Sequence, residues 1–149
     1  MTAQTNTQPV IVGVDGSASS VSALVHGARI AAALHAPLEA VSAWTIPVML
    51  DPFSPDVDWS PKEQAQRALA ESVAAAFLGD PPAGLQQRTI AGPAAKALIE
   101  ESAHARMLVV GSRGLGGFAR MLIGSVSAAC AAHAACPVLV VRDAPATEG

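Results

Sequence analysis

Short apolar runs alternate along this chain with segments in which apolar residues recur every three or four positions. The runs are rich in valine, isoleucine and leucine, as expected of strands covered on both faces. The segments between them have the spacing of amphipathic helices. Strands and helices that alternate in this way form right-handed crossovers and a parallel sheet, so the pattern predicts an α/β fold. We expect strands at 10–14, 38–44, 85–91, 107–110 and 137–141, the third of them at an edge because polar residues interrupt it.

Residues that favour helix starts precede the helical segments. Ser17 follows the break at Asp15-Gly16, and Ser60-Pro61-Lys62-Glu63 combines a capping serine with a first-turn proline and a glutamate. Ser125 is expected to cap the last helix and His133 to lie on its buried face. The first helix is expected to bury a stripe of apolar residues: Val21, Leu24, Val25 and Ala28.

The composition excludes several classes of protein. A net charge of −3, from 9 basic and 12 acidic residues, provides no basic face for nucleic acid. The apolar runs are too short to span a bilayer, and the first residues do not resemble a secretory signal. Two cysteines are too few for a disulfide framework. We therefore expect a cytoplasmic protein with one domain at 9–143, a disordered tail at 1–8 and a short tail at 144–149.

The first and fourth predicted strands end in Asp15 and Gly111, and open parallel sheets bind ligands beyond the carboxyl ends of their strands. A glycine-rich segment runs from Gly111 to Ser125 and includes Arg113 and Arg120. Glycine lets backbone approach a phosphate closely, and the free N–H groups of the following helix attract anions. The segment therefore predicts a phosphate site, although it contains neither the P-loop motif nor the paired-glycine dinucleotide fingerprint.

Less specific interpretations of these residues stay open. A glycine-rich loop can be a simple connector, and Asp15 can cap the first helix as well as face a ligand. The irregular stretch at 45–60 is either a contact surface or a local connection. The histidines lack the paired spacing of zinc ligands, so no metal site is assigned from them.

Four residues of the glycine-rich segment carry a family resemblance. Gly111, Gly114, Gly124 and Ser125 match the pattern Gly-x2-Gly-x9-Gly-Ser/Thr without a gap. With the Val-Gly-Val-Asp-Gly-Ser start and the Pro-Val-Leu-Val-Val end, the chain resembles the nucleotide-binding branch of the universal stress protein family along nearly its whole length. The resemblance implies a Rossmann-like fold of the adenine nucleotide alpha hydrolase type, with helices on both faces of a five-stranded sheet in the order 3-2-1-4-5.

The resemblance also implies a ligand and a partner. The ligand is ATP, with Mg²⁺ held through Asp15 as an option and AMP or a cyclic nucleotide as alternatives. The partner is a second copy of the chain, paired through the last strand: Val138, Leu139, Val140 and Val141.

Site residues carry over from the family by position. Val14 and Asp15 would lie beside the ribose and phosphates, and the backbone at Trp44 would meet the adenine. The other positions would line the ribose and hold the phosphates: Gly111, Arg113, Gly114, Gly124, Ser125, Val126 and Ser127. Trp44 is bulkier than the residue common at its position, and Arg106 replaces a common acidic residue.

The function expected on these grounds is that of a dimeric, ATP-binding sensor or regulator in the stress response. No catalytic residue is assigned. A slow ATPase or phosphotransfer enzyme using Asp15 and Arg113 is one alternative. A scaffold that acts without nucleotide, through its last strand and the 45–60 stretch, is another.

Overall fold

The computed structural model describes residues 7–46, 60–113 and 123–142, and strands and helices alternate along them. The predicted order of elements is confirmed, with each strand within a few residues of its predicted bounds. The elements are β1 (Val10–Gly13), α1 (Ala18–Leu34), β2 (Leu38–Trp44), α2 (Pro61–Phe77), β3 (Gln86–Ala91), α3 (Ala94–Ser102), β4 (Met107–Gly111), α4 (Ser125–His133) and β5 (Val138–Val141).

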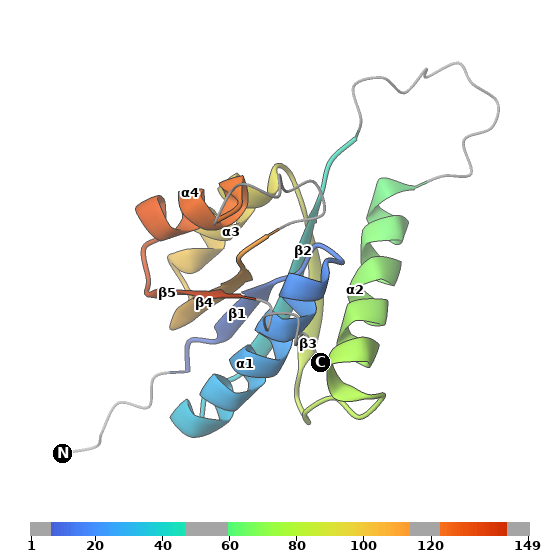
Figure 1. Ribbon diagram of the computed structural model, residues 1–149, viewed down its shortest axis with the longest axis vertical. Helices are drawn as coiled ribbons and strands as arrows, with labels where there is room; N and C mark the ends of the chain where they lie inside the picture. The colour runs from blue at the N-terminus through green and yellow to red at the C-terminus, as the bar shows by residue number, and fades with distance from the viewer. Residues whose placement is uncertain (1–6, 47–59, 114–122, 143–149) are drawn as a thin grey trace, which may run out of the picture.

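All five strands join one parallel sheet in the order β3-β2-β1-β4-β5. The predicted sheet is therefore confirmed, and β3 occupies an edge as expected. Helices α1 and α2 cover one face, and α3 and α4 cover the other (Figure 1). The chain order reverses between β1 and β4, which places the switch point of the sheet at its centre.

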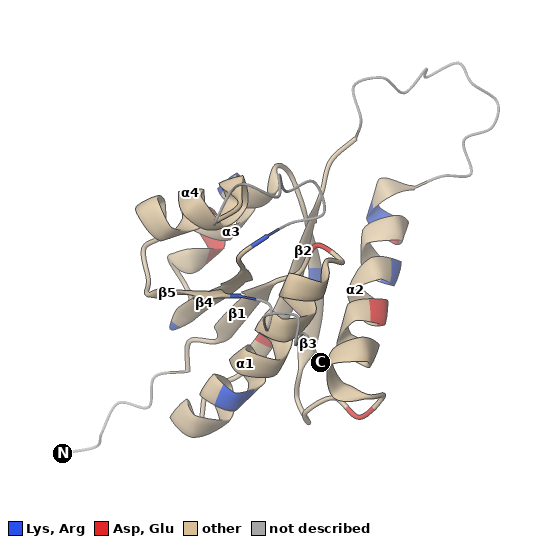
Figure 2. Cartoon of the chain, in the orientation of Figure 1, with Lys and Arg blue, Asp and Glu red and all other residues tan. Residues whose placement is uncertain are grey.

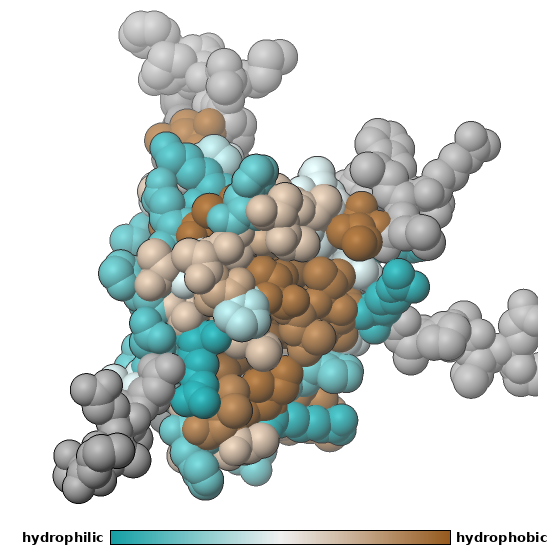
Figure 3. Space-filling model, turned by 90° about the vertical axis from the view of Figure 1, so that its left-hand side faces the viewer, coloured by the Kyte–Doolittle hydropathy of each residue, from teal (hydrophilic) through white to brown (hydrophobic). Residues whose placement is uncertain are grey.

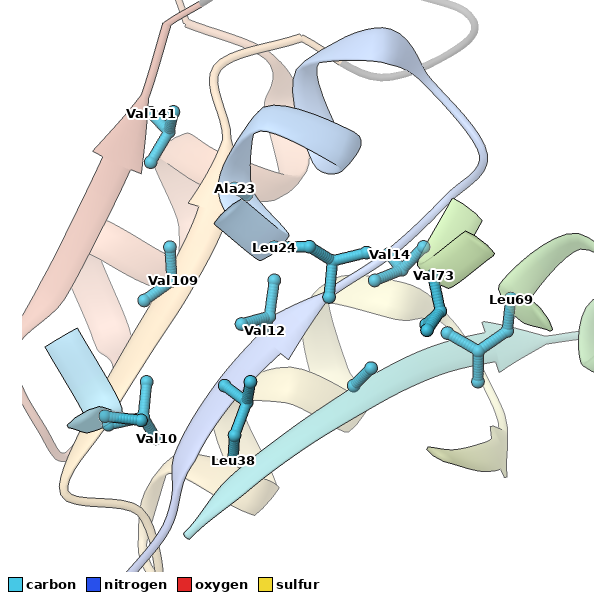
Figure 4. Packing of buried hydrophobic residues seen from close by; sticks show 12 residues of the cluster. Val10, Val12, Val14, Ala23, Leu24, Leu38, Leu69, Val73, Val109 and Val141 are labelled. Atoms are coloured by element: carbon cyan, nitrogen blue, oxygen red, sulfur yellow. The ribbon is translucent and has the colours of Figure 1, made fainter. Parts of the chain in front are cut away.

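Each face of the sheet has its own hydrophobic core. Val10 and Val12 of β1 point toward α1 and α2, where they pack with Leu24 (Figure 4). Ile11 points the other way, toward α3 and α4, and packs with Leu108. Because successive strand residues face opposite sides and both sides are buried, the central strands read as continuous apolar runs.

Helix α1 meets the sheet through small residues, and this differs from the stripe predicted for it. Its buried positions are Ser19, Ser20, Ala23, Leu24, Gly27 and Ala31, whereas Val21, Val25 and Ala28 are only partly buried. A Cβ atom on Gly27 would lie 2.5 Å from Cγ2 of Val12. The absence of that atom lets the helix approach β1 closely, so the buried face is centred on its smallest residues and not on its valines.

Two of the three predicted helix caps are confirmed. The Ser17 hydroxyl accepts from the backbone N–H of Ser20, and the Ser60 hydroxyl accepts from that of Glu63. The prediction for Ser125 is wrong, because Gly124 caps α4 and Ser125 is the first helical residue. His133 is also exposed and not buried, since α4 turns Ser127 and Cys130 toward the protein interior.

Charged residues form ion pairs at one edge of the sheet and also lie along the surface of α2. Arg88 of β3 forms ion pairs with Glu39 of β2 at 2.7 Å and with Glu101 of α3 at 2.8 Å. The hydrogen bond that Arg88 donates to Glu101 raises the pKa of Arg88 above its ordinary value. Basic and acidic residues alternate along α2 (Figure 2). None of the helices described here combines the length and apolar character needed to cross a bilayer.

Candidate functional site

A pocket opens at the carboxyl ends of β1 and β4, where the strand order reverses. It is bounded by the ends of three strands, the first turn of α1, helix α3 and the start of α4. Its described lining residues are Gly13, Val14, Asp15, Ser17, Ser20, Val41, Ala43, Ala94, Leu98, Val110, Gly111, Arg113, Val126 and Ser127. This is the place at which a doubly wound sheet is expected to bind a ligand.

The pocket brings together six of the ten predicted site residues. These six are Val14, Asp15, Gly111, Arg113, Val126 and Ser127. Gly124, Ser125 and Trp44 are close in sequence to lining residues but do not line the pocket themselves. Gly114 lies outside the described residues, as do Arg120 and most of the 45–60 stretch.

Asp15 supplies the one carboxylate among the described lining residues. The side chain is exposed, and its Oδ1 accepts from the backbone N–H of Ser17 at 2.9 Å. Gly16, with a φ of 88°, makes the turn between them. Asp15 therefore binds the backbone of Ser17, and the hydroxyl of Ser17 caps α1. The described residues contain no cluster of three or more side chains that could ligate a metal by themselves.

Helix α4 begins at the pocket without a side-chain cap. Gly124 occupies the N-cap position, and a glycine has no side chain to accept from the first turn. Val126 and Ser127 of that turn line the pocket. The Ser127 hydroxyl is buried and donates within the protein, 3.4 Å from the carbonyl oxygens of Ser112 and Gly124. A helix start of this kind attracts an anion.

Gly111 lies at the end of β4 under the first turn of α1. A Cβ atom here would lie 2.7 Å from the carbonyl carbon of Ser19. Because that contact is with backbone, it could not be relieved by a side-chain rotation. Gly111 thus allows α1 to pack on β4, a role that the glycine-rich pattern alone did not indicate.

The opposite wall of the pocket is apolar. Val41 and Ala43 of β2 line it together with Leu98 and Ala94 of α3. These residues cannot be assigned to the site from the sequence, since small and branched apolar side chains are common throughout the chain. Trp44, which was assigned, uses its carbonyl oxygen to accept from the N–H of Gly92 at 2.8 Å. The polar lining side chains therefore come from the residues that follow β1 and β4 and from the starts of α1 and α4, whereas β2 and α3 contribute apolar side chains.

Comparisons with known sequences agree with this arrangement. The profile of the universal stress protein family matches residues 6–142. A universal stress protein of Mycolicibacterium smegmatis is 38% identical over 135 residues, and one of Mycobacterium tuberculosis is 36% identical over 136 residues. These alignments cover 90% and 91% of this chain but 45% of each relative, so the chain spans about half the length of the curated relatives it matches.

Solved structures show the same fold. A universal stress protein in complex with cAMP superposes with a TM-score of 0.67 and 30% identity, covering 90% of this chain and 96% of that protein. A universal stress protein from Lactobacillus plantarum superposes with a TM-score of 0.74 and 20% identity, covering 92% and 99% of the two chains. From its sequence, sheet order and fold, this chain belongs to the universal stress protein family.

Proposed function

We propose that the pocket at the switch point binds an adenine nucleotide and that its ligand is ATP. The observation that carries this proposal is the meeting of the uncapped start of α4 with Arg113 and Asp15 in one pocket. Main-chain N–H groups at a helix start and a nearby guanidinium are complementary to a phosphate chain. Gly114, Gly124 and Ser125 complete the proposed phosphate contacts, as the family pattern implies.

The apolar side of the pocket would receive the base. Val41 and Ala43 on one side and Leu98 on the other form walls suited to a flat heteroaromatic ring. Main-chain groups near the end of β2, around Ala43 and Trp44, would supply polar contacts to adenine. The ribose would then lie over the ends of β1 and β4, between Val14 and Gly111. A related universal stress protein that is 30% identical has been solved with cAMP, which supports an adenine ligand here.

Mg²⁺ fits this site as a companion of the phosphates. The ion commonly takes one or two protein carboxylates and fills its other positions with phosphate oxygens and water. Asp15 is the lining residue that would supply such a carboxylate. AMP and cyclic nucleotides, which carry a single phosphate, remain the alternative ligands.

Replacement of Arg113 with alanine tests the phosphate side of this assignment. We expect Arg113→Ala to weaken ATP binding about tenfold, because a charge-assisted contact is lost, and to leave adenosine binding unchanged. Titration calorimetry with ATP, AMP, cAMP and adenosine, with and without Mg²⁺, measures both effects. Arg29→Ala, at an exposed arginine of α1 outside the pocket, is the matched control. Equal ATP affinity in the wild type and Arg113→Ala would remove Arg113 from the site.

We propose that the protein is a homodimer in which two copies pair through β5. In the described sheet β5 is hydrogen-bonded to β4 alone, so its other edge is free to pair. Val138, Leu139 and Val140 are only partly buried, and hydrophobic side chains gather on the side of the molecule that carries this edge (Figure 3). A free apolar edge of this kind favours pairing with another strand.

Charge on the β5 edge should disrupt the dimer. Val140→Lys places an ammonium group in the proposed apolar interface, so light scattering should show the wild type at twice the chain mass and the variant as a monomer. Leu78→Lys is the control, because Leu78 is 92% exposed and follows α2, outside the proposed interface. A monomeric wild type, or a dimeric Val140→Lys, would contradict the proposed interface.

The position of the pocket relative to β5 supports the proposal of a regulatory role. The carbonyl oxygen of Val141, the last residue of β5, accepts from the N–H of Ser112 at 2.8 Å, and the Ser112 carbonyl accepts from the N–H of Gly124 at 2.6 Å. These bonds join the start of α4 to the proposed dimer edge. We propose that the chain acts in the cytoplasm as a nucleotide-dependent sensor in the stress response, with occupancy of the pocket transmitted along this connection.

A further inference from the structure

Both polar backbone groups of Arg113 are bound by serines of helix α1. The Arg113 N–H donates to the hydroxyl oxygen of Ser19 at 3.3 Å. The Arg113 carbonyl accepts from the hydroxyl of Ser17 at 3.2 Å. These contacts join residues more than ninety positions apart in the sequence, and they meet at the point where the glycine-rich segment begins.

Each of the two hydroxyl groups donates one hydrogen bond and accepts another. The Ser17 hydroxyl accepts from the N–H of Ser20 while it donates to Arg113. The Ser19 hydroxyl accepts from Arg113 and donates to the carbonyl of Val141 at 3.4 Å. A serine hydroxyl has one proton to donate, so this arrangement fixes the direction of both bonds to Arg113.

The two serines differ in their access to the pocket. Ser17 is a lining residue and could touch a ligand directly. Ser19 is 2% exposed, does not line the pocket and packs against Gly111. Any effect of the Ser19 hydroxyl on a ligand must therefore pass through the residues that it holds.

Arg113 needs such support because it lies beyond the sheet. The last residue pair between β4 and β5 is Gly111 with Val141, two positions before Arg113. None of the described strands pairs with the backbone at Arg113, and the serine hydroxyls bind the groups that a neighbouring strand would otherwise bind. The side chain of Arg113 is exposed, so its direction depends on how its backbone is held.

We propose that Ser19 and Ser17 are positioning residues that hold the backbone of Arg113 for the phosphate side of the nucleotide site. They fix the start of the glycine-rich segment against α1, so that the guanidinium faces the pocket opposite the start of α4. This inference rests on the proposed nucleotide function. It adds that the first turn of α1 determines affinity for the phosphates and contributes little to affinity for the nucleoside.

Ser19→Ala is the variant that tests the proposal most cleanly. It keeps the Cβ atom that packs against Gly111 and removes only the hydroxyl. We expect the affinity for ATP to fall about tenfold, as for the loss of one well-placed hydrogen bond, while the affinity for adenosine stays within about twofold. Calorimetric titration of both ligands gives the ratio of the two affinities, which a merely structural role would not change.

The chain contains a matched control. Ser102 is 1% exposed, and its hydroxyl accepts from the N–H of Ala135 at 2.8 Å, far from the pocket at the other end of α3. Ser102→Ala should lower thermal stability by an amount similar to that of Ser19→Ala and leave both nucleotide affinities unchanged. Ser17→Gly keeps a tolerated cap and should lose affinity for ATP.

A second measurement separates this proposal from the proposed function. Amide hydrogen exchange at Arg113 should accelerate about tenfold in Ser19→Ala, and exchange at Ala135 should accelerate in Ser102→Ala. Unchanged ATP affinity in Ser19→Ala, or an equal loss for ATP and adenosine, would overturn the positioning role while nucleotide binding stands. A wild type that binds no nucleotide would instead overturn the proposed function, whatever the exchange at Arg113 shows.

Discussion

Replacement of Gly111 with alanine should lower the free energy of unfolding by about 3 kcal/mol, the upper part of the range for an overpacked core. The added Cβ would lie 2.7 Å from the backbone carbonyl carbon of Ser19. Neither β4, which is paired on both sides, nor the capped first turn of α1 can move without losing hydrogen bonds and packing. Denaturant unfolding monitored by circular dichroism measures the loss as a shift of the midpoint.

The matched control is Gly13→Ala at the end of the neighbouring strand β1. There the added Cβ would meet Cδ1 of Leu98 at 2.8 Å, the flexible end of a side chain that can rotate away. The control should therefore lose about 1 kcal/mol or less. If the two variants were equally stable, the close approach of α1 to Gly111 would not be the rigid contact described above.

Ala43→Phe should abolish nucleotide binding, with a loss of affinity of about 100-fold or more. Ala43 lines the apolar side of the pocket, where the base is proposed to lie. A phenyl ring on this strand position would occupy the space of the adenine ring, and aromatic residues are well tolerated in strands. The variant should unfold at nearly the same denaturant concentration as the wild type, since the ring fills a pocket that is already open.

The same exchange in another hollow of the described residues provides the control. Ala32 of α1 is exposed and lines an open depression with Phe77 and Pro82, away from the switch point. Ala32→Phe should bind ATP as the wild type does. Undiminished ATP binding by Ala43→Phe would show that the nucleotide does not use the pocket between β2 and α3.

The strands could be predicted from the sequence because both faces of the sheet are buried. Residues such as Val10 and Ile11 face opposite cores, so β1, β4 and β5 appear as nearly uninterrupted apolar runs. The buried face of α1 could not be predicted from apolar spacing. It is centred on Ser19, Ala23 and Gly27, whose small size matters more for the close approach of helix and sheet than their hydrophobicity does.

The polar side of the site could be predicted, and its apolar side could not. Asp15, Gly111 and Arg113 follow strands directly, and strand ends meet at one edge of a parallel sheet. Ala43 and Leu98 carry no chemical signal of their own and become lining residues only through the pairing of β2 and the packing of α3. The bonds of Ser17 and Ser19 to Arg113 also depend on the tertiary fold, since they join distant parts of the chain.

A crystal structure of the chain grown with ATP and Mg²⁺ tests the central claim most directly. The nucleotide is predicted to lie across the ends of β1 and β4, with adenine between Ala43 and Leu98. Its phosphates are predicted within hydrogen-bonding distance of the main-chain N–H groups of Val126 and Ser127. Density for ATP at any other surface, or a pocket that stays empty at saturating ATP, would contradict the claim.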